Sequence, residues 1–168
     1  MVIRVSDIPD EGIRLDSAAG LQGVYPDEGW SLGALSLRIE RRGRAVAVRG
    51  GFEAMTCLAC SRCLEPLAVE VRPALDLHLV PVPTVRQGET ELGRDDLEVD
   101  FYTGDTLDVD GLLRSETDLA LPMKPLCRAD CRGLCPVCGG NRNLTDCHCA
   151  TRGPDPRLAA LEALRRLR

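Results

Sequence analysis

The sequence has 168 residues and a formal net charge of −5, which suits one domain or two small ones with a modest core. Aromatic residues make up only 3%, so the core must consist of Leu, Val and Ala, and base stacking is a poor candidate for the main mode of nucleic-acid binding. The N-terminal segment lacks the features of a signal peptide, and no apolar run is long enough to span a bilayer. We therefore expect a cytoplasmic protein with no membrane partner, in a reducing compartment where structural disulfides are rare.

The charges are distributed unevenly along the chain. Residues 89–118 are strongly acidic, whereas the chain from Lys124 onward is basic. A basic C-terminal third could contact phosphate, but charge alone favours an ordinary solvated surface. The like charges of residues 89–118 would repel the phosphates of any nucleic acid, whereas a basic protein could contact them.

The beginning of the chain predicts strands. A short strand is expected over residues 1–5, followed by loops up to about residue 30. Apolar and polar residues then alternate over 35–39 and again over 46–48, on either side of a turn at Gly43. This pattern predicts two strands joined as a hairpin.

Two further alternating runs follow the first cysteine group, over residues 67–71 and 75–79. They place Cys60–Cys63 at a tip between two strands. His78 is out of phase with its apolar neighbours, so we interpret it as a solvent-facing strand residue and not as a metal ligand.

The second half predicts an irregular acidic connection over 81–106, short strands over 97–101 and 107–109, and a helix over 111–121. Asp110 is the expected N-cap of this helix, and Pro122 ends it. Its apolar side is expected to carry the apolar groups of Leu112, Leu113, Glu116, Leu119 and Ala120. A second helix is expected from Asp155-Pro156 to the C-terminus, because Asp and Pro suit its N-cap and first position and a leucine recurs along it.

The nine cysteines carry the main chemical signal. Nine is odd, and dense cysteine in a reducing compartment indicates metal binding before disulfides. In Cys135-Pro-Val-Cys138-Gly, Pro136 favours a turn and Gly139 permits a positive φ, as a zinc knuckle requires. The predicted ligands form two zinc sites of four thiolates each: Cys60, Cys63, Cys127 and Cys131 in the first, and Cys135, Cys138, Cys147 and Cys149 in the second.

Other interpretations of the cysteines are open at this point. A single zinc could take Cys131, Cys135, Cys138 and Cys149, or His148 could replace one thiolate. Four cysteines also suit an iron–sulfur cluster. Cys57 is left over, and we interpret it as a buried small apolar residue at a strand end.

No pattern of catalytic residues stands out. The sequence has no Gly-rich phosphate loop, no Ser/His/Asp arrangement and no His-Glu-x-x-His motif, and neither histidine has a recognisable partner. The acidic pairs suit loop solvation better than general acid–base chemistry. We therefore predict a protein that is not an enzyme and has no small-molecule substrate.

Four stretches resemble the YceD family, the large ribosomal RNA subunit accumulation proteins of bacteria and plastids. They are Cys60-Ser-Arg-Cys63-Leu-Glu-Pro, Leu119-Ala-Leu-Pro-Met-Lys-Pro-Leu-Cys127, Cys131-Arg-Gly-Leu-Cys135-Pro-Val-Cys138-Gly and the closing Asp155-Pro-Arg-Leu-Ala-Ala-Leu. The resemblance runs from about residue 44 to the end. It implies a non-enzymatic role in accumulating large-subunit (23S) ribosomal RNA during assembly of the large ribosomal subunit, with precursor rRNA or a ribosomal protein as partner.

Two further expectations complete the interpretation. Arginines beside the proposed ligands are candidates for an RNA-binding patch, because zinc knuckles present short basic loops rigidly: Arg62, Arg128, Arg132 and Arg142. The alternatives are an adaptor or chaperone for a basic ribosomal protein and, as a third hypothesis, a zinc-gated redox switch.

The expected fold is α+β, with a small, mostly antiparallel sheet, one or two helices and a zinc-stapled, cysteine-rich C-terminal segment. We expect a β-rich part over 1–80 with the first cysteine group, the acidic connection over 81–106, and a helix, the cysteine-rich segment and a C-terminal helix over 107–168. Together they are expected to form one compact domain.

Overall fold

The computed structural model describes residues 1–21, 23–25, 29–82, 93 and 99–150. Contacts divide the chain into two compact units. The first contains Met1–Leu58 and Ala68–Met123, and the second contains Ala59–Leu67 and the chain from Lys124 onward. These units differ from the linear segments drawn from the sequence, and a single compact domain stays a prediction.

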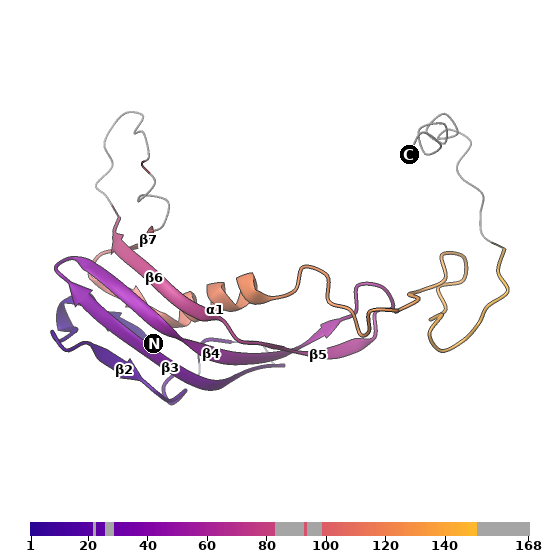
Figure 1. Cartoon of the computed structure of the whole chain (residues 1–168), viewed down its shortest axis with the longest axis horizontal. Coiled ribbons are helices and arrows are strands. Elements are labelled where there is room, and N and C mark those ends of the chain that lie inside the picture. The colour runs from indigo at the N-terminus through magenta and orange to yellow at the C-terminus, as the bar shows by residue number, and fades with distance from the viewer. Residues whose placement is uncertain (22, 26–28, 83–92, 94–98, 151–168) are drawn as a thin grey trace. The chain divides into compact units, whose positions relative to one another are not determined.

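A mixed sheet forms the first unit (Figure 1). Its neighbouring strands are antiparallel except for the last pair, which is parallel. The strand order is β2 (Ile13–Leu15), β3 (Trp30–Arg42), β4 (Ala45–Ala59), β6 (Ala74–Pro81) and β7 (Val99–Tyr102), and β5 (Pro66–Val71) also pairs with β4. The prediction of a mostly antiparallel α+β fold is confirmed.

The predicted hairpin is present as β3 and β4, joined at Gly43, whose φ of 64° lies in the left-handed region that glycine adopts without strain. Leu37 and Ile39 on β3 are buried, whereas the intervening Arg38 is exposed. This alternation follows from the two-residue period of a strand that has one face on the core. His78 on β6 is exposed, as predicted.

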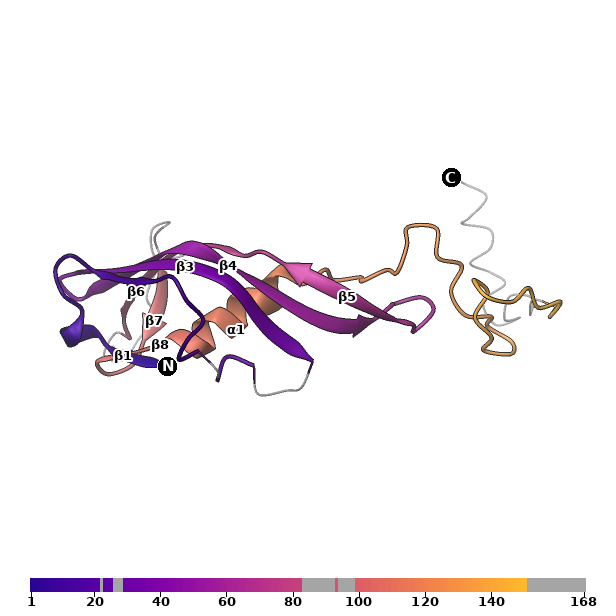
Figure 2. The ribbon, with the colours of Figure 1, turned by 90° about the horizontal axis from the view of Figure 1, so that it is seen from below.

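Helix α1 (Val109–Ala120) lies along one face of the sheet (Figure 2). Its N-cap is Asp108, whose side chain accepts a hydrogen bond from the Gly111 amide, so the prediction of Asp110 as the cap is wrong. Asp110 instead occupies the first turn, where its carboxylate pairs with the Met1 amine. An Asp is favourable both at the N-cap and in the first turn, where its carboxylate complements the helix dipole. The sequence alone therefore does not tell which of Asp108 and Asp110 is the N-cap.

The buried side of α1 also differs from the prediction. Val109, Leu113 and Thr117 recur every four residues and are buried, whereas Leu119 is 79% exposed and Ala120 is exposed. The polar Thr117 can be buried because its hydroxyl donates to the Leu113 carbonyl at 2.7 Å. The helix ends before Pro122, as predicted.

The N-terminal segment contributes more than the predicted strand and loops. Strand β1 (Val2–Arg4) pairs with β8 (Thr106–Asp108) in a separate two-stranded sheet. A short 3-10 helix, η1 (Val5–Asp7), and strand β2 follow. The expectation of loops up to residue 30 is therefore wrong at η1 and β2, whereas the described residues between β2 and β3 form no helix or strand. Apolar residues of this segment that show no periodicity are nevertheless buried in the core: Val5, Ile8, Leu21 and Val24.

Some sequence predictions fall outside the described residues. These are the C-terminal helix from Asp155, much of the acidic connection over 81–106, and the first two residues of the strand expected over 97–101. In the part of the chain that the structure describes, no helix is long and apolar enough to cross a membrane.

Candidate metal centres

Two turns with the same backbone geometry organise the second unit. In the first, Cys60 and Cys63 lie between the end of β4 and the start of β5. The Leu64 amide donates to the Cys60 carbonyl at 2.9 Å, and the Cys60 amide donates to the Glu65 carbonyl at 2.9 Å. These two bonds close the turn, so both thiols lie on one short loop.

The second turn repeats this pattern at Cys135 and Cys138. The Gly139 amide donates to the Cys135 carbonyl at 2.9 Å, and the Cys135 amide donates to the Gly140 carbonyl at 2.8 Å. Gly139 has a φ of 72°, and Leu64 occupies the equivalent place with a φ of 63°. The glycine at position 139 signals the second turn in the sequence. The first turn has no such signal, because a leucine takes the left-handed conformation there, which costs a residue with a side chain about 1 kcal/mol.

The first cluster brings together Cys60, Cys63, Cys127 and Cys131. The Cys60 and Cys131 sulfurs lie 3.8 Å apart, and the Cys63 and Cys127 sulfurs lie 3.6 Å apart. Cys60, Cys63 and Cys131 are buried and form a small apolar cluster, against which Leu67 and Leu126 pack.

The second cluster brings together Cys135, Cys138, Cys147 and Cys149. As in the first cluster, the four sulfurs all lie within 4.8 Å of one another. Cys135 is buried and Cys138 is exposed, so this cluster is the more accessible to solvent.

Asn143, which lies between the cysteines of the second cluster in sequence, contacts the first cluster. Its side-chain amide donates to the Cys131 sulfur at 3.3 Å, and its side-chain oxygen accepts a hydrogen bond from the Arg132 amide at 2.8 Å. Asn141 in turn accepts from the Asn143 side chain at 2.9 Å. No cysteine spacing signals this asparagine, whose position depends on the folded loop.

Backbone donors stabilise one thiolate in each cluster. The amides of Cys127, Arg62 and Cys63 lower the pKa of Cys60 to about 6. The amides of Cys138 and Val137 similarly lower the pKa of Cys135 to about 6. Hydrogen bonding to the charged form of a thiol favours ionisation, so these two thiols ionise more readily than an ordinary cysteine.

Other thiols of the same clusters are held neutral. Burial, together with hydrogen bonds to the neighbouring sulfurs, raises the pKa of Cys127 to about 12. The pKa of Cys149 is raised to about 12, first by its hydrogen bond to Cys138 and then by burial. Four thiols this close cannot all ionise without a compensating cation, because like charges at this separation repel strongly.

The donor sets fit a tetrahedral metal ion. Zinc–sulfur bonds of about 2.3 Å in a tetrahedron place the sulfurs about 3.8 Å apart, close to both separations in the first cluster. A disulfide would need about 2.05 Å. Two groups of four cysteines could therefore each hold a metal ion.

The thiols gather in the two groups of four drawn from the sequence spacing, and their role as ligands stays a prediction. Cys131 lies with the first group, and His148 is exposed and belongs to neither. Cys57 is exposed, so the expectation of a buried residue is wrong. It alternates on β4 with the buried Thr56, which takes the inward position.

Of the four candidate RNA-binding arginines, Arg62 is tied to the loop of the first cluster. Its guanidinium donates to the carbonyls of Ala129 at 3.3 Å and Cys131 at 2.9 Å. This places Arg62 in the framework that holds Cys127–Cys131 against the first turn.

The other three arginines are exposed, as Arg62 is, but none of them is bonded to a carbonyl of the first cluster's loop. Arg128 donates to the Asn143 side chain at 2.8 Å, and Arg132 pairs with Asp146 at 2.7 Å. Arg142 has no side-chain partner among the described residues. Each guanidinium has five N–H donors, so Arg128 and Arg132 retain donors for a further partner.

Comparison with known proteins identifies the family. The family model described as "Large ribosomal RNA subunit accumulation protein YceD" matches residues 48–165. Uncharacterized proteins of Mycobacterium tuberculosis and Mycobacterium bovis are 37% identical over 120 residues, which is 71% of this chain and 56% of theirs. An uncharacterized protein of Mycobacterium leprae is 31% identical over 105 residues, or 62% of this chain and 46% of its own.

The chain thus spans about half the length of the curated relatives that it matches. No solved structure matches it. The family model covers well over half of the chain, including all eight cysteines of the two clusters. This chain belongs to the YceD family of large ribosomal RNA subunit accumulation proteins.

Proposed function

We propose that this protein is a cytoplasmic, non-enzymatic factor that promotes accumulation of large-subunit (23S) ribosomal RNA during assembly of the large ribosomal subunit, and that it binds two zinc ions. The observation that supports this most is the match to the YceD family model over a segment that contains both four-cysteine clusters. Four thiols suit a closed structural zinc site, which leaves no open coordination position for catalysis.

The zinc ions have a structural role in this proposal. Each cluster fixes short loops that a small apolar core could not order alone, since metal binding and folding are coupled in such segments. Zinc analysis of protein purified without added metal should give two ions per chain. Visible absorbance in fresh, anaerobic protein would instead indicate an iron–sulfur cluster.

The RNA contact is assigned to three of the exposed arginines of the second unit, namely Arg128, Arg132 and Arg142. Arginine suits phosphate recognition because its planar group offers several donors and a permanent charge. Arg62 was predicted with them, and its bonds to the Ala129 and Cys131 carbonyls support a framework role as well. Replacing Arg62 would therefore disturb the first cluster along with any RNA contact.

The test separates these two effects. The triple variant R128E/R132E/R142E should retain two zinc ions but associate more weakly with precursor large-subunit particles on sucrose gradients. The matched control R4E/R42E/R44E makes the same charge change at exposed positions of the first unit and should associate normally. Equal association of both variants would reject the arginine patch. A normal large-subunit peak and rRNA level in cells lacking the gene would reject the proposed function.

A second candidate is an adaptor for a basic ribosomal protein, favoured by a groove in the first unit that contains unpartnered carboxylates, described below. Co-purification of a basic protein after nuclease treatment would support it, whereas salt-dependent binding to naked rRNA supports the first candidate. A zinc-gated redox switch is the weakest of the three, because it requires oxidant-driven zinc release that also changes binding.

A further inference from the structure

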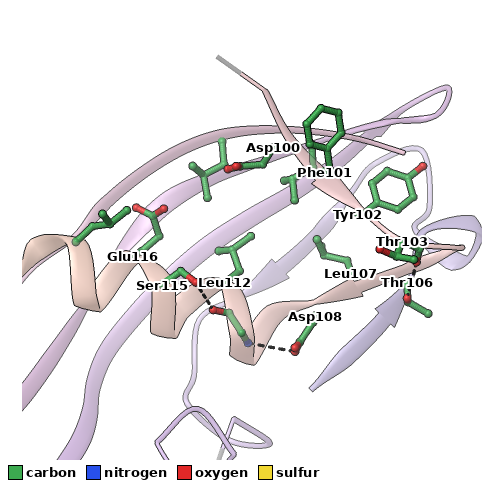
Figure 3. Close-up of a pocket in the computed structure, with 14 residues that line it drawn as sticks. Asp100, Phe101, Tyr102, Thr103, Thr106, Leu107, Asp108, Leu112, Ser115 and Glu116 are labelled. Carbon is green, nitrogen blue, oxygen red and sulfur yellow. Dashed lines mark hydrogen bonds between the residues drawn. The ribbon is translucent and has the colours of Figure 1, made fainter. Parts of the chain in front are cut away.

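A groove of about 520 Å3 lies in the first unit between α1 and the strands β6 and β7 (Figure 3). Leu77 and Leu79 from β6 and Leu112 from α1 contribute apolar side chains to it. The groove is far larger than a water site, and all its lining residues belong to the first unit, whereas the residues of both cysteine clusters belong to the second.

Two apolar side chains at the groove are exposed to solvent. Phe101 on β7 is 54% exposed, and Leu119 at the end of α1 is 79% exposed. Phe101 is one of only two phenylalanines in the chain. Exposed apolar residues that line a groove favour an interaction surface, whereas single scattered ones need no explanation.

The charged groups of the groove are all acidic. Asp100 on β7 and Glu116 on α1 project into the space between strand and helix (Figure 3). Asp108 also lines the groove, but its carboxylate caps α1. Within the described residues, no Lys or Arg lines the groove and no ion pair involves Asp100 or Glu116.

The environment of Glu116 would stabilise a positively charged group bound in the groove. Burial raises the pKa of Glu116, and the nearby charge of Asp100 raises it further. A carboxyl group whose ionised form is disfavoured by burial and by a neighbouring carboxylate marks a position where a positive charge would be stabilised. An ammonium or guanidinium group placed between them would reverse this effect, while its aliphatic stem could cover the neighbouring leucines.

We propose that this groove is the docking site for a basic amphipathic segment of a partner protein, with its cations at Asp100 and Glu116 and its apolar side chains over Leu112 and Leu119 and against Phe101 at the edge of the groove. Charge complementarity selects this occupant. RNA would bring phosphate toward unpartnered carboxylates, and a second copy of the same groove would bring like charges together.

The groove would be the surface through which an adaptor binds a basic ribosomal protein. The proposal therefore rests on the adaptor function, and it does not depend on an rRNA contact of the second unit. Failure of peptide binding would therefore reject the groove and leave the arginine test unaffected. Loss of rRNA association in R128E/R132E/R142E would likewise say nothing against the groove.

Fluorescence anisotropy with a labelled Lys/Leu amphipathic peptide tests the proposal on the full-length, zinc-loaded protein. D100N/E116Q should weaken binding about tenfold, because it removes both carboxylates while preserving shape. D10N/E11Q removes two exposed carboxylates elsewhere in the first unit and should leave binding unchanged. Equal binding by the wild type and D100N/E116Q would overturn the proposal.

The apolar contribution is tested in the same assay. F101S/L119S changes two side chains that are more than half exposed, so the fold should be retained, and binding should weaken about tenfold. A peptide with Ser in place of Leu, and one with Glu in place of Lys, should each bind at least tenfold more weakly. Equal binding of either peptide, competition by a short RNA, or dimer formation through this face would each assign the groove to another occupant.

Discussion

The two cysteine clusters use the same turn but connect very different lengths of chain. In the first, Cys60 and Cys131 are separated by 71 positions in sequence, and three of its four cysteines are buried. The second is built entirely within residues 135–149, and only Cys135 is buried. A metal ion at the first cluster therefore fixes tertiary structure, whereas one at the second fixes a local loop.

This difference has a physical cause. Bringing together two segments so far apart in sequence costs more chain entropy than closing a loop of about fifteen residues, although the cost rises only slowly with length. The first cluster offsets this cost with apolar packing from Leu67 and Leu126 and with the bonds from Arg62 to the Cys127–Cys131 loop. The second cluster needs less support because its ligands are neighbours.

The largest expected effect comes from removing one ligand of each cluster. Cys60→Ser should lose the first metal and with it most of the order of the second unit, since a structural zinc contributes about 10 kcal/mol or more to folding. Cys149→Ser should lose only the second metal. Zinc content per chain and limited proteolysis measure both effects.

The two variants control for each other, because each changes one sulfur to oxygen. Loss of both metals in Cys149→Ser would show that the clusters fold as one cooperative unit and would remove the distinction between them. Retention of two metals in either variant would exclude that cysteine as a ligand.

A smaller effect is expected from two glycines with nearly the same backbone conformation. Gly133 has a φ of 70°, and an added Cβ would lie 3.0 Å from the Arg62 carbonyl oxygen. Gly139 has a φ of 72°, but an added Cβ would meet nothing within 4 Å. Gly133→Ala should lower the free energy of unfolding by about 2–3 kcal/mol, and Gly139→Ala by about 1 kcal/mol.

Thermal unfolding at a fixed free zinc concentration measures this pair. The additional loss of unfolding free energy in Gly133→Ala, compared with Gly139→Ala, measures the close approach between the Arg62 backbone and the loop after Cys131. If the two substitutions have equal effects, the close approach of Gly133 to the Arg62 backbone contributes nothing to stability.

The smallest effect is expected at Leu64, which occupies in the first turn the position that Gly139 occupies in the second. Leu64 has a φ of 63° and is 64% exposed, so Leu64→Gly removes backbone strain and little buried area. The added freedom of glycine in the unfolded chain opposes this gain. We expect stability to rise by roughly 0.5 kcal/mol, measured as a shift in the unfolding midpoint. A loss of more than about 1 kcal/mol would show that the Leu64 side chain packs in solution.

Much of this molecule could be predicted from local patterns. Alternation over 35–39 and 46–48 predicted the β3–β4 hairpin, because a strand with one buried face imposes a period of two on its residues. Pro122 predicted the end of α1 because proline disfavours helical conformation in the residue before it. The Cys-x-x-Cys pairs marked both turns, since this spacing suits two thiolates on one ion.

Other features depend on partners that are distant in sequence. The parallel pairing of β6 with β7 and the pairing of β1 with β8 join segments that share no local pattern. The N-cap of α1 was placed two residues late, because Asp108 and Asp110 both suit a helix start and only the chain direction at β8 selects between them. Cys57 was expected to be buried, but the alternation along β4 turns it outward.

The sequence by itself determined that this chain belongs to a cysteine-rich α+β family, because ligand spacing, alternation and helix stops are local properties of the chain. Only the tertiary structure decided between the groupings of thiols that the sequence left open, and it alone showed which arginine supports the first cluster and that Asp100 and Glu116 line one groove. Residues far apart in sequence come close when the apolar faces of separate elements pack together. The spacing of residues along the chain does not predict these contacts.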